Sequence, residues 1–424
     1  MRVTTADERR DVLVIGGGPG GAAAAYWLAR SGHDVAFVER KTFPREKTCG
    51  DGLTPRAVHQ LQEMGLEPAI VAAGHHRYDG LRACAHGIAL ELKWPQHPIF
   101  PSYGYVVRRR DLDRLVAEHA VAAGATLHQG TEAVAPLIDG GLVRGAVVKE
   151  KERGTTREIR ARYVIVADGA NSRFGRALGA QRNRSFPQGM AIRGYFESPL
   201  HAEPWIESAL DVRDRNGNSL PGYGWIFPVG DGTINVGIGL LSTFRDWKSV
   251  NTTHLMNEFS LTAPEYWGIS PDTARSVPTG GRLPMGGSVT PNVGPNWVLI
   301  GDAAGTINPF NGEGIDYAYE TGRLAASLIG ESLAGDGMAL QRYPELIDAE
   351  YGLYFKVARV FAKVIGNPAL LNELTRVGMH SRTLMEWVLR IMANLLREDE
   401  LGPAEAVYKA VAQLARVIPE PAAS

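Results

Sequence analysis

Three glycines near the start of the sequence have the spacing of a phosphate-binding turn. Gly16, Gly18 and Gly21 form a G-x-G-x-x-G pattern between an apolar run and an alanine-rich run. In such a turn the first glycine permits a tight bend, the second lets the backbone approach a pyrophosphate, and the third lets helix and strand pack closely. The N-terminus of the helix also offers free N–H groups and a partial positive charge. The pattern predicts a dinucleotide site, with a glycine-rich turn that binds nothing as the simpler alternative.

Glu39 is placed to recognise a sugar of that dinucleotide. It lies 23 residues after Gly16, at the end of the next apolar run. There a carboxylate can accept hydrogen bonds from both ribose hydroxyls, and it would repel a 2′-phosphate. The turn and the acid together favour FAD or NAD over NADP.

Two further aspartates, Asp168 and Asp302, each follow an apolar run that predicts a buried strand. Open α/β sheets bind their ligands at the carboxyl ends of strands. Asp302 could accept a hydrogen bond from a ribityl hydroxyl, and a helix beginning at Gly314 would direct its positive end at the ligand. Because a reduced flavin is anionic around N1 and the C2 carbonyl, this arrangement favours FAD. The alternative is that both aspartates only cap turns or helices.

The elements that must hold these residues follow from the apolar periodicity. A strand over 11–15, a helix over 22–30 and a strand over 35–38 make a βαβ unit. Also predicted are a helix over 110–124, strands over 163–167 and 297–300, and a helix over 314–329.

Residues 189–290 have a different character. Asn216-Gly217 and Asp231-Gly232 are strong hairpin turns between strand-like runs. We therefore expect an antiparallel sheet set apart from the nucleotide-binding part. From about Leu340 the sequence is helical, with breaks at Pro344, Pro368 and Pro403.

Four motifs occur in an order that resembles a known flavoprotein superfamily. They are the glycine turn with Glu39, Arg109-x-x-Leu112-Asp113, Ala167-Asp168-Gly169 and Gly301-Asp302. The superfamily includes aromatic hydroxylases, flavin halogenases and geranylgeranyl reductases. The resemblance implies FAD, an α/β Rossmann-like domain of the glutathione-reductase type, and an antiparallel substrate domain. It also implies cofactor contacts at Gly16, Gly18, Gly20, Gly21, Glu39, Arg40, Gly50, Arg109, Val134, Asp168, Asp302, Gly312, Gly314 and Ile315.

Two motifs narrow the resemblance to the geranylgeranyl reductase family. Residues 47–52 (KTCGDG) resemble its P-C-G-D/E-G loop, with Thr48 in place of proline. Residues 223–228 (YGWIFP) resemble its Y-x-W-x-F-P substrate strand, with the leading proline displaced to Pro221. Segments 44–56 and 308–314 are most similar to actinobacterial menaquinone reductases, which reduce one isoprene double bond of the menaquinone tail. The resemblance thus implies reduction of a carbon–carbon double bond in an isoprenoid chain, of menaquinone or a geranylgeranyl group.

The expected domain organisation combines these patterns. Residues 10–188 and 291–335 are expected to form the FAD-binding domain, with some strands of the substrate domain interleaved. Residues 189–290 are expected to form the antiparallel substrate domain, and residues 336–424 a helical C-terminal region.

Tyr223, Trp225 and Phe227 alternate along one predicted strand, so they share a face. They would wall an apolar slot for an isoprenoid substrate, whereas without the resemblance an ordinary sheet core is the better interpretation.

Cys49 is the candidate catalytic residue, because its glycine-bracketed loop allows close approach to a ring system. An inert buried thiol is the ordinary alternative. The proton donor stays open among Cys49, Tyr223 and water, and Cys84 has no predicted role.

Two rival functions stay open. An oxygen-using monooxygenase or a halogenase could use the same fold, although halogenases carry W-x-W-x-I-P where this chain has Tyr223-x-Trp225-x-Phe227-Pro228. A prenyl carrier without enzymatic activity is the second rival, and intact cofactor motifs count against it. The sequence has no second nucleotide motif, so the electron donor is left open among NAD(P)H, ferredoxin and similar carriers.

Composition limits the partners. The formal charge of −1 gives no general attraction to nucleic acid, and two cysteines fit a reducing compartment. No metal is expected, because the histidines lack ligand spacing. The first ten residues lack the apolar core of a signal peptide, and no apolar run is long enough to span a bilayer. We expect a cytoplasmic protein, and a peripheral contact with the inner face of the cell membrane stays open. The segment 383–396 is apolar over most of its circumference. We interpret it as part of the core, with membrane docking as the alternative.

Overall fold

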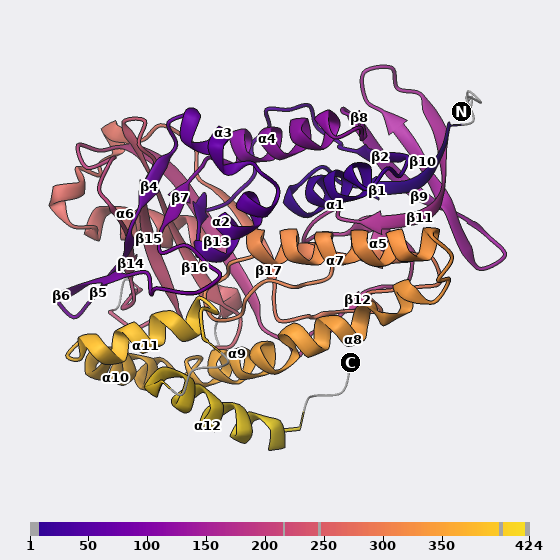
Figure 1. Cartoon of the computed structure of the whole chain (residues 1–424). Helices are drawn as coiled ribbons and strands as arrows, with labels where there is room; N and C mark the ends of the chain where they lie inside the picture. The colour runs from indigo at the N-terminus through magenta and orange to yellow at the C-terminus, as the bar shows by residue number, and fades with distance from the viewer. Residues whose placement is uncertain (1–7, 215–216, 245–246, 398–401, 420–424) are drawn as a thin grey trace.

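The computed structural model describes residues 8–214, 217–244, 247–397 and 402–419. Two seven-stranded sheets form the frame of the molecule, one on the right and one on the left of Figure 1. The C-terminal helices lie below the second sheet in the same view. None of the described helices is long and apolar enough to cross a membrane.

The first sheet contains the N-terminal βαβ unit. Its strands are β1 (Glu8–Ile15), β2 (Val35–Val38), β8 (Thr126–His128), β9 (Thr131–Asp139), β10 (Leu142–Glu150), β11 (Thr156–Val166) and β19 (Trp297–Leu299). Their order is β8-β2-β1-β11-β10-β9, and β19 pairs with the end of β11. β10 and β9 are antiparallel additions to an otherwise parallel sheet. β11 begins earlier than the predicted strand over 163–167, because its first half forms a ladder with β10.

Three helices cover one face of this sheet: α1 (Pro19–Arg30), α4 (Arg109–Ala122) and α7 (Ile315–Leu333). The run of alanines from 22 to 25 is fully buried against Val12 and Val14, because small side chains let α1 lie close to the strands. The predicted βαβ unit is confirmed, and β2 has the predicted bounds. α4 and α7 each begin within one residue of the predicted start.

The second sheet draws on two parts of the chain. Its strands are β5 (Gly80–Ala85), β6 (Ile88–Lys93), β13 (Gln188–Glu197), β14 (Trp205–Ala209), β15 (Gly222–Pro228), β16 (Thr233–Leu241) and β17 (Thr279–Pro284). The order is β17-β13-β16-β15-β14-β5-β6, and every pair is antiparallel except β14 with β5. The antiparallel sheet expected over residues 189–290 is therefore confirmed, and β5, which lies outside that range, adds a parallel pair at β14. Turn signals predict hairpins between neighbouring strands, whereas a parallel pair joins strands that are far apart in sequence.

The predicted hairpin turns have different outcomes. Asp231-Gly232 joins β15 to β16 as predicted. Asn216 lies outside the described residues, and Gly217 lies in a turn between β14 and β15 with a φ of +78°.

Helix α6 (Thr252–Thr262) covers one face of the second sheet. It begins where the Asn251 side chain accepts a hydrogen bond of 3.1 Å from the backbone N–H of His254. An added Cβ on Gly224 would lie 2.3 Å from the Phe259 ring, so β15 and α6 meet closely. The opposite face of β15 is left to line a cavity.

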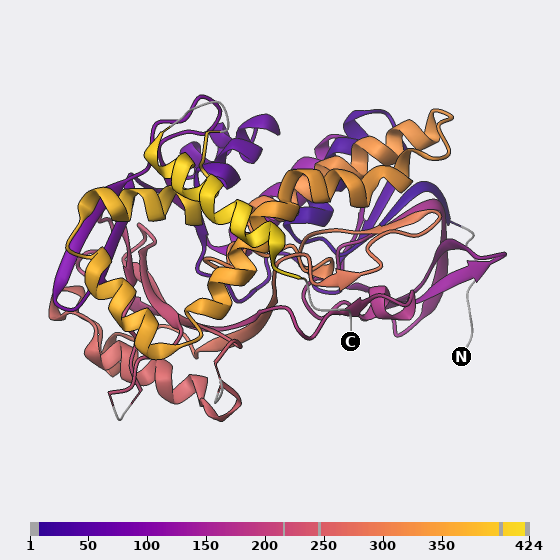
Figure 2. The ribbon, with the colours of Figure 1, turned by 90° about the horizontal axis from the view of Figure 1, so that it is seen from below.

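The C-terminal helices are α8 (Tyr343–Ile347), α9 (Leu353–Val364), α10 (Pro368–Gly378), α11 (Arg382–Met392) and α12 (Pro403–Val417). Pro344, Pro368 and Pro403 each lie in the first turn of a helix, where a missing N–H leaves no bond unmade. Figure 2 shows that α9, α10, α11 and α12 are arranged around an opening in the ribbon beneath the second sheet.

Shorter elements connect these layers. They are α2 (Pro55–Glu63), α3 (Glu67–Ala72), α5 (Arg173–Ala177), β3 (Gly52–Leu53), β4 (His76–Tyr78), β7 (Gly104–Val106), β12 (Gln181–Arg182) and β18 (Val289–Thr290).

Candidate functional site

One continuous cavity connects the glycine turn with the C-terminal helices. Its volume is about 1480 Å³, whereas pockets for one small molecule usually hold about 300–1,000 Å³. Strand ends of the first sheet, one face of the second sheet, and all four helices from α9 to α12 line it. The cavity therefore has room for a dinucleotide and for a second, apolar ligand.

The glycines of the turn have different geometric requirements. Gly16 has a φ of +110°, and an added Cβ would lie 2.3 Å from the carbonyl oxygen of Ala167. At Gly21 an added Cβ would lie 1.9 Å from the carbonyl oxygen of Gly16. At Gly18, which lines the cavity, the nearest atom would be Arg45 Nη2 at 3.8 Å. Gly16 and Gly21 are thus needed by the fold, while the space beside Gly18 is free for a ligand.

Four charged side chains form a buried ladder along the cavity wall. Arg45 lies 3.2 Å from Glu39 and 2.9 Å from Asp113. Arg109 donates two hydrogen bonds, of 2.7 and 2.8 Å, to the same Asp113 carboxylate. None of the four side chains is more than 9% exposed. Alternating charges neutralise one another, so the ladder fixes Glu39 and Arg109 in place.

The two strand-end aspartates both line the cavity. Asp168 accepts a hydrogen bond of 3.0 Å from the backbone N–H of Phe174, so it also serves as a turn residue. Its Oδ1 is buried and has no hydrogen-bond partner among the described residues, and burial raises the pKa of Asp168. Asp302 Oδ1 would lie 3.3 Å from a Cβ added to Gly314. Gly314 is the N-cap of α7, so the positive end of this helix adjoins the cavity.

The loop that carries Cys49 is anchored by Asp51. Asp51 is fully buried and has a φ of +67°. Its carboxylate accepts hydrogen bonds from the Arg109 backbone N–H at 3.1 Å, from the Asn235 side chain at 2.8 Å and from the Tyr195 hydroxyl. Burial raises the pKa of Asp51, and these hydrogen bonds oppose that rise. Asn235 also donates to the carbonyl oxygen of Cys49 at 2.9 Å, so the loop is fixed at the cavity wall.

Tyr223, Trp225 and Phe227 share the cavity face of β15, as their alternation predicts. The ring centroids of Tyr223 and Trp225 are 6.0 Å apart, and those of Trp225 and Phe227 are 6.3 Å apart. A Cβ added to Gly237 would lie 2.2 Å from the Trp225 ring, so the indole lies over the backbone of β16. A Cβ added to Gly50 would lie 3.1 Å from the Phe227 ring, so the aromatic wall meets the Cys49 loop.

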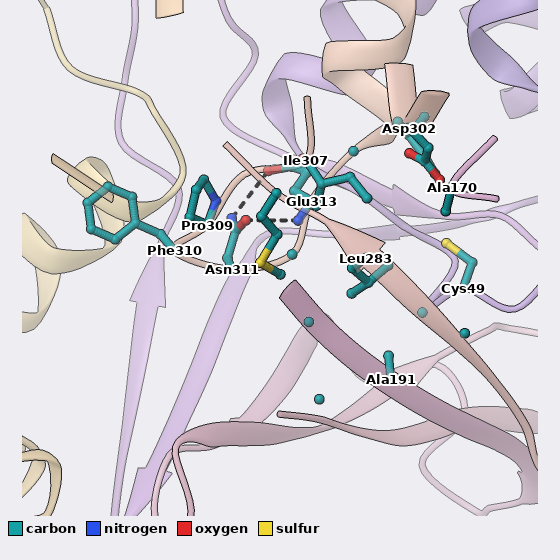
Figure 3. A pocket seen from close by; sticks show the side chains of 18 of the residues that line it. Cys49, Ala170, Ala191, Leu283, Asp302, Ile307, Pro309, Phe310, Asn311 and Glu313 are labelled. Carbon is teal, nitrogen blue, oxygen red and sulfur yellow. Dashed lines mark hydrogen bonds between the residues drawn. The ribbon is translucent and has the colours of Figure 1, made fainter. Parts of the chain in front are cut away.

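A carboxyl group that the motifs did not single out, Glu313, lines the same cavity. The Thr54 hydroxyl donates a hydrogen bond to Glu313, and the Asn311 side chain donates another of 3.3 Å. The Tyr223 hydroxyl donates to the backbone oxygen of Asn311 at 2.6 Å. Figure 3 shows Asn311 and Glu313 joined by hydrogen bonds, with Cys49 on a neighbouring wall. Burial raises the pKa of Glu313 to about 7, so its carboxyl group holds a proton in weakly acidic solution.

The Cys49 thiol is also held neutral. Burial raises its pKa, and the positive charge of Arg109 only partly opposes this effect. Cys84, on β5, does not line the cavity.

The apolar segment 383–396 points inward. Met385 and Leu389 are buried in a cluster with residues of β4, β5 and β6. The inner face of α11 also forms part of the cavity wall, through Leu384, Met385, Val388, Leu389, Ile391 and Met392. The segment is thus a shared boundary of core and cavity.

Most predicted cofactor-binding residues line the cavity: Gly16, Gly18, Gly20, Glu39, Arg40, Gly50, Arg109, Asp168, Asp302, Gly312, Gly314 and Ile315. Gly21 packs behind the turn instead. The side chain of Val134 is 48% exposed and does not line the cavity, although Glu132 and Ala133 do. Arg45, Asn235 and Thr54 were missed, because no local motif marks a residue whose partners are distant in sequence.

The residues present fit FAD. The space beside Gly18 can admit a pyrophosphate, and the unpartnered Asp168 Oδ1 and the N-terminus of α7 adjoin the same crevice. When bound there, FAD would be held by the backbone of the turn, by the ladder residues Glu39 and Arg109, and by Asp302.

Comparison with known proteins agrees with this geometry. A family model described as an FAD binding domain matches residues 9–214. The menaquinone reductase of Mycobacterium tuberculosis is 42% identical over 97% of this chain and 98% of its own length, and that of Mycolicibacterium smegmatis is 41% identical over the same shares. Digeranylgeranylglycerophospholipid reductase 2 of Methanosphaera stadtmanae is 32% identical over 82% of this chain and 85% of its own.

Solved structures share the fold at lower identity. A geranylgeranyl bacteriochlorophyll reductase-like protein from Thermoplasma acidophilum has a TM-score of 0.77 at 22% identity, covering 95% of this chain and 99% of its own. A flavin-dependent brominase has a TM-score of 0.72 at 20% identity, covering 96% and 99%.

Fold and site together define an FAD-dependent oxidoreductase. More narrowly, the chain belongs to the geranylgeranyl reductase family of flavoproteins, together with the mycobacterial menaquinone reductases.

Proposed function

We propose that the chain saturates a carbon–carbon double bond in an isoprenoid chain, either the side chain of menaquinone or a geranylgeranyl group. One observation carries the proposal: a single cavity joins the dinucleotide crevice to a slot walled by aromatic and aliphatic side chains. The names of the full-length relatives support the same substrate class.

Reduction of an isolated alkene needs a hydride on one carbon and a proton on the other. Bound FAD, in its reduced form, supplies the hydride. Tyr223, Trp225 and Phe227 hold the isoprene unit by apolar contact and exclude water from it. Cys49 closes the slot beside them, because Asp51 and Asn235 hold its loop against Phe227.

Glu313 is the proposed proton donor. Its carboxyl group is buried, lines the cavity and has a pKa raised by burial to about 7, close to the value that suits a general acid at neutral pH. The Cys49 thiol is the competing candidate, but burial raises its pKa from an already weakly acidic value, so it releases its proton less readily. Solvent deuterium incorporation separates the two. Glu313→Gln should slow alkene deuteration far more than Cys49→Ser.

The central test is stoichiometric. Photoreduced holoenzyme is mixed anaerobically with menaquinone-9, and the lipid is examined by mass spectrometry. A gain of two hydrogens that persists after the quinone ring has been reoxidised in air supports the reductase, because reduction of the ring alone also adds two hydrogens. Product that forms only when oxygen is admitted contradicts it. The oxygen requirement would instead support a monooxygenase or a halogenase. The Tyr223-x-Trp225-x-Phe227-Pro228 sequence counts against the halogenase alone. A protein that binds the lipid and no flavin would point to a carrier.

The electrons come from NAD(P)H or from a ferredoxin-type carrier, and the protein works at the inner face of the cell membrane as a peripheral protein. Anaerobic mixing of the oxidised holoenzyme with NADH, NADPH and reduced ferredoxin in turn, with flavin bleaching as the readout, identifies the donor.

A further inference from the structure

Exposed aliphatic side chains surround the helical end of the cavity. Val364 ends α9, Leu374 lies on α10 and Val411 lies on α12. Each of the three lines the cavity, yet they are 40%, 46% and 42% exposed. They therefore mark the place where the cavity opens to solvent, among α9, α10 and α12.

The exposed apolar side chains continue along two helix faces away from this opening. On α10 the exposed apolar side chains are Leu370, Leu374 and Val377, with spacings of four and three residues. On α12 Val407, Val411 and Leu414 have the same spacings, which place side chains on one face of a helix. Of the nineteen large hydrophobic side chains that are exposed in the described part of the chain, nine lie between residues 364 and 418. We call these nine the mouth surface: Val364, Leu370, Leu374, Val377, Val407, Val411, Leu414, Val417 and Ile418.

The charge around the mouth surface is positive. The sequence from 353 to 418 has nine lysines and arginines against six aspartates and glutamates, whereas the whole chain has a net charge of −1. Lys363, Lys409 and Arg416 are exposed on the same helices as the apolar side chains. Apolar faces flanked by basic residues are typical of helices that lie in the interface of an anionic bilayer.

We propose that the mouth surface docks on an anionic lipid bilayer, so that the isoprenoid substrate enters the cavity directly from the membrane. The proposal rests on the proposed function for the identity of the ligand. It assigns docking to α10 and α12. α11 does not provide the docking face, because six of its apolar side chains already line the cavity: Leu384, Met385, Val388, Leu389, Ile391 and Met392. Entry from the bilayer would spare a long isoprenoid from crossing water.

Vesicle flotation of the FAD-loaded full chain tests the proposal. The vesicles contain phosphatidylcholine with or without phosphatidylglycerol, and no quinone. We expect binding that is stronger with phosphatidylglycerol. The variant Val377→Glu/Leu414→Glu changes two side chains that are 56% and 68% exposed and that do not line the cavity. It should lower the partition coefficient by about tenfold or more, since each glutamate removes an apolar contact and adds a charge.

The matched control is Leu261→Glu/Val277→Glu, which changes two side chains that are 70% and 82% exposed but lie outside the mouth surface. It should float like the wild type. Flavin content and melting temperature confirm folding, and if the double variant does not fold, each single glutamate should still lower the partition by about threefold.

Three outcomes overturn the proposal. They are a wild-type chain that does not bind vesicles, equal loss in both double variants, and self-association that Val377→Glu/Leu414→Glu abolishes while vesicle binding is absent. The last result would make this surface an interface with a second copy of the chain. Because the vesicles hold no substrate, failure of docking is distinct from failure of the reductase assay, which uses wild-type enzyme and detergent-dispersed menaquinone.

Discussion

The side-chain amide of Asn235 donates a hydrogen bond of 2.8 Å to the carboxylate of Asp51. Asn235 is on β16 of the second sheet, whereas Asp51 belongs to the loop that carries Cys49. The same amide reaches the Cys49 carbonyl oxygen, and the Asn235 carbonyl accepts a bond of 2.9 Å from the Trp225 indole. One buried side chain therefore sets the position of the loop and of an aromatic wall residue together.

Replacement of Asn235 by alanine should loosen this arrangement. The change removes one of the three hydrogen bonds that the buried Asp51 carboxylate accepts, and it also removes the partner of the Trp225 indole N–H. We therefore expect unfolding to become easier by about 3 kcal/mol. Urea unfolding followed by far-UV circular dichroism measures it. Asn257→Ala, at an exposed position on α6, is the control and should change stability little. A loss below about 1 kcal/mol for Asn235→Ala would contradict the anchoring role.

The glycine turn predicts opposite effects for two similar substitutions. Gly18→Ala meets no protein atom closer than 3.8 Å, so the protein should fold but bind FAD poorly. Gly21→Ala would place its Cβ 1.9 Å from a backbone oxygen, so folding itself should fail. The soluble yield, the melting temperature and the ratio of flavin to protein absorbance distinguish the two. A Gly18→Ala protein with a full complement of flavin would show that the open space there is not the pyrophosphate site.

Neighbouring arginines offer a matched test of the ladder. The guanidinium group of Arg109 donates two parallel hydrogen bonds to the Asp113 carboxylate. The ammonium group of a lysine at this position cannot reproduce that bidentate geometry. We expect the dissociation constant of FAD to rise by about tenfold, as measured by quenching of flavin fluorescence. Arg110, whose side chain is 47% exposed, serves as the comparison. If Arg109→Lys and Arg110→Lys changed the dissociation constant of FAD equally, the ladder would not contribute to FAD binding.

Glu313 should give the stability curve a distinct pH dependence. Burial raises the pKa of Glu313 from 4.5 to about 7 in the folded protein. As pH rises from 4.5, the unfolded chain loses this proton first, so the stability contributed by the protonated group declines until about pH 7 and is constant above it. Compared with the wild type, Glu313→Gln should therefore gain relative stability between pH 5 and pH 7.

Melting temperatures at pH 5, 6, 7 and 8 measure this difference. Glu118→Gln, which alters a side chain that is 64% exposed on α4, is the control. Parallel curves for the wild type and Glu313→Gln would show that Glu313 does not keep its proton in the folded protein.

Local patterns predicted the parallel strands β1, β2 and β19, the end of β11 and the helices α1, α4 and α7, but they did not predict β8, β9 or β10. The turn at 16–21, β2 and the starts of α4 and α7 each depend on neighbouring residues and on backbone preferences that act within one turn or strand. Where partners are distant, the same reasoning fell short. The parallel pairing of β14 with β5 and the bridging role of Arg45 between Glu39 and Asp113 carry no local sign.

The sequence by itself determined the dinucleotide turn, the alternation that puts Tyr223, Trp225 and Phe227 on one face, and the helical character of the C-terminal region. Only the tertiary structure decided that this face opens on a cavity, that α9 to α12 line the cavity's far end, and that burial there raises the pKa of Glu313. The physical reason is that periodicity specifies which side of an element is apolar, while burial and pKa depend on what other elements are packed against that side.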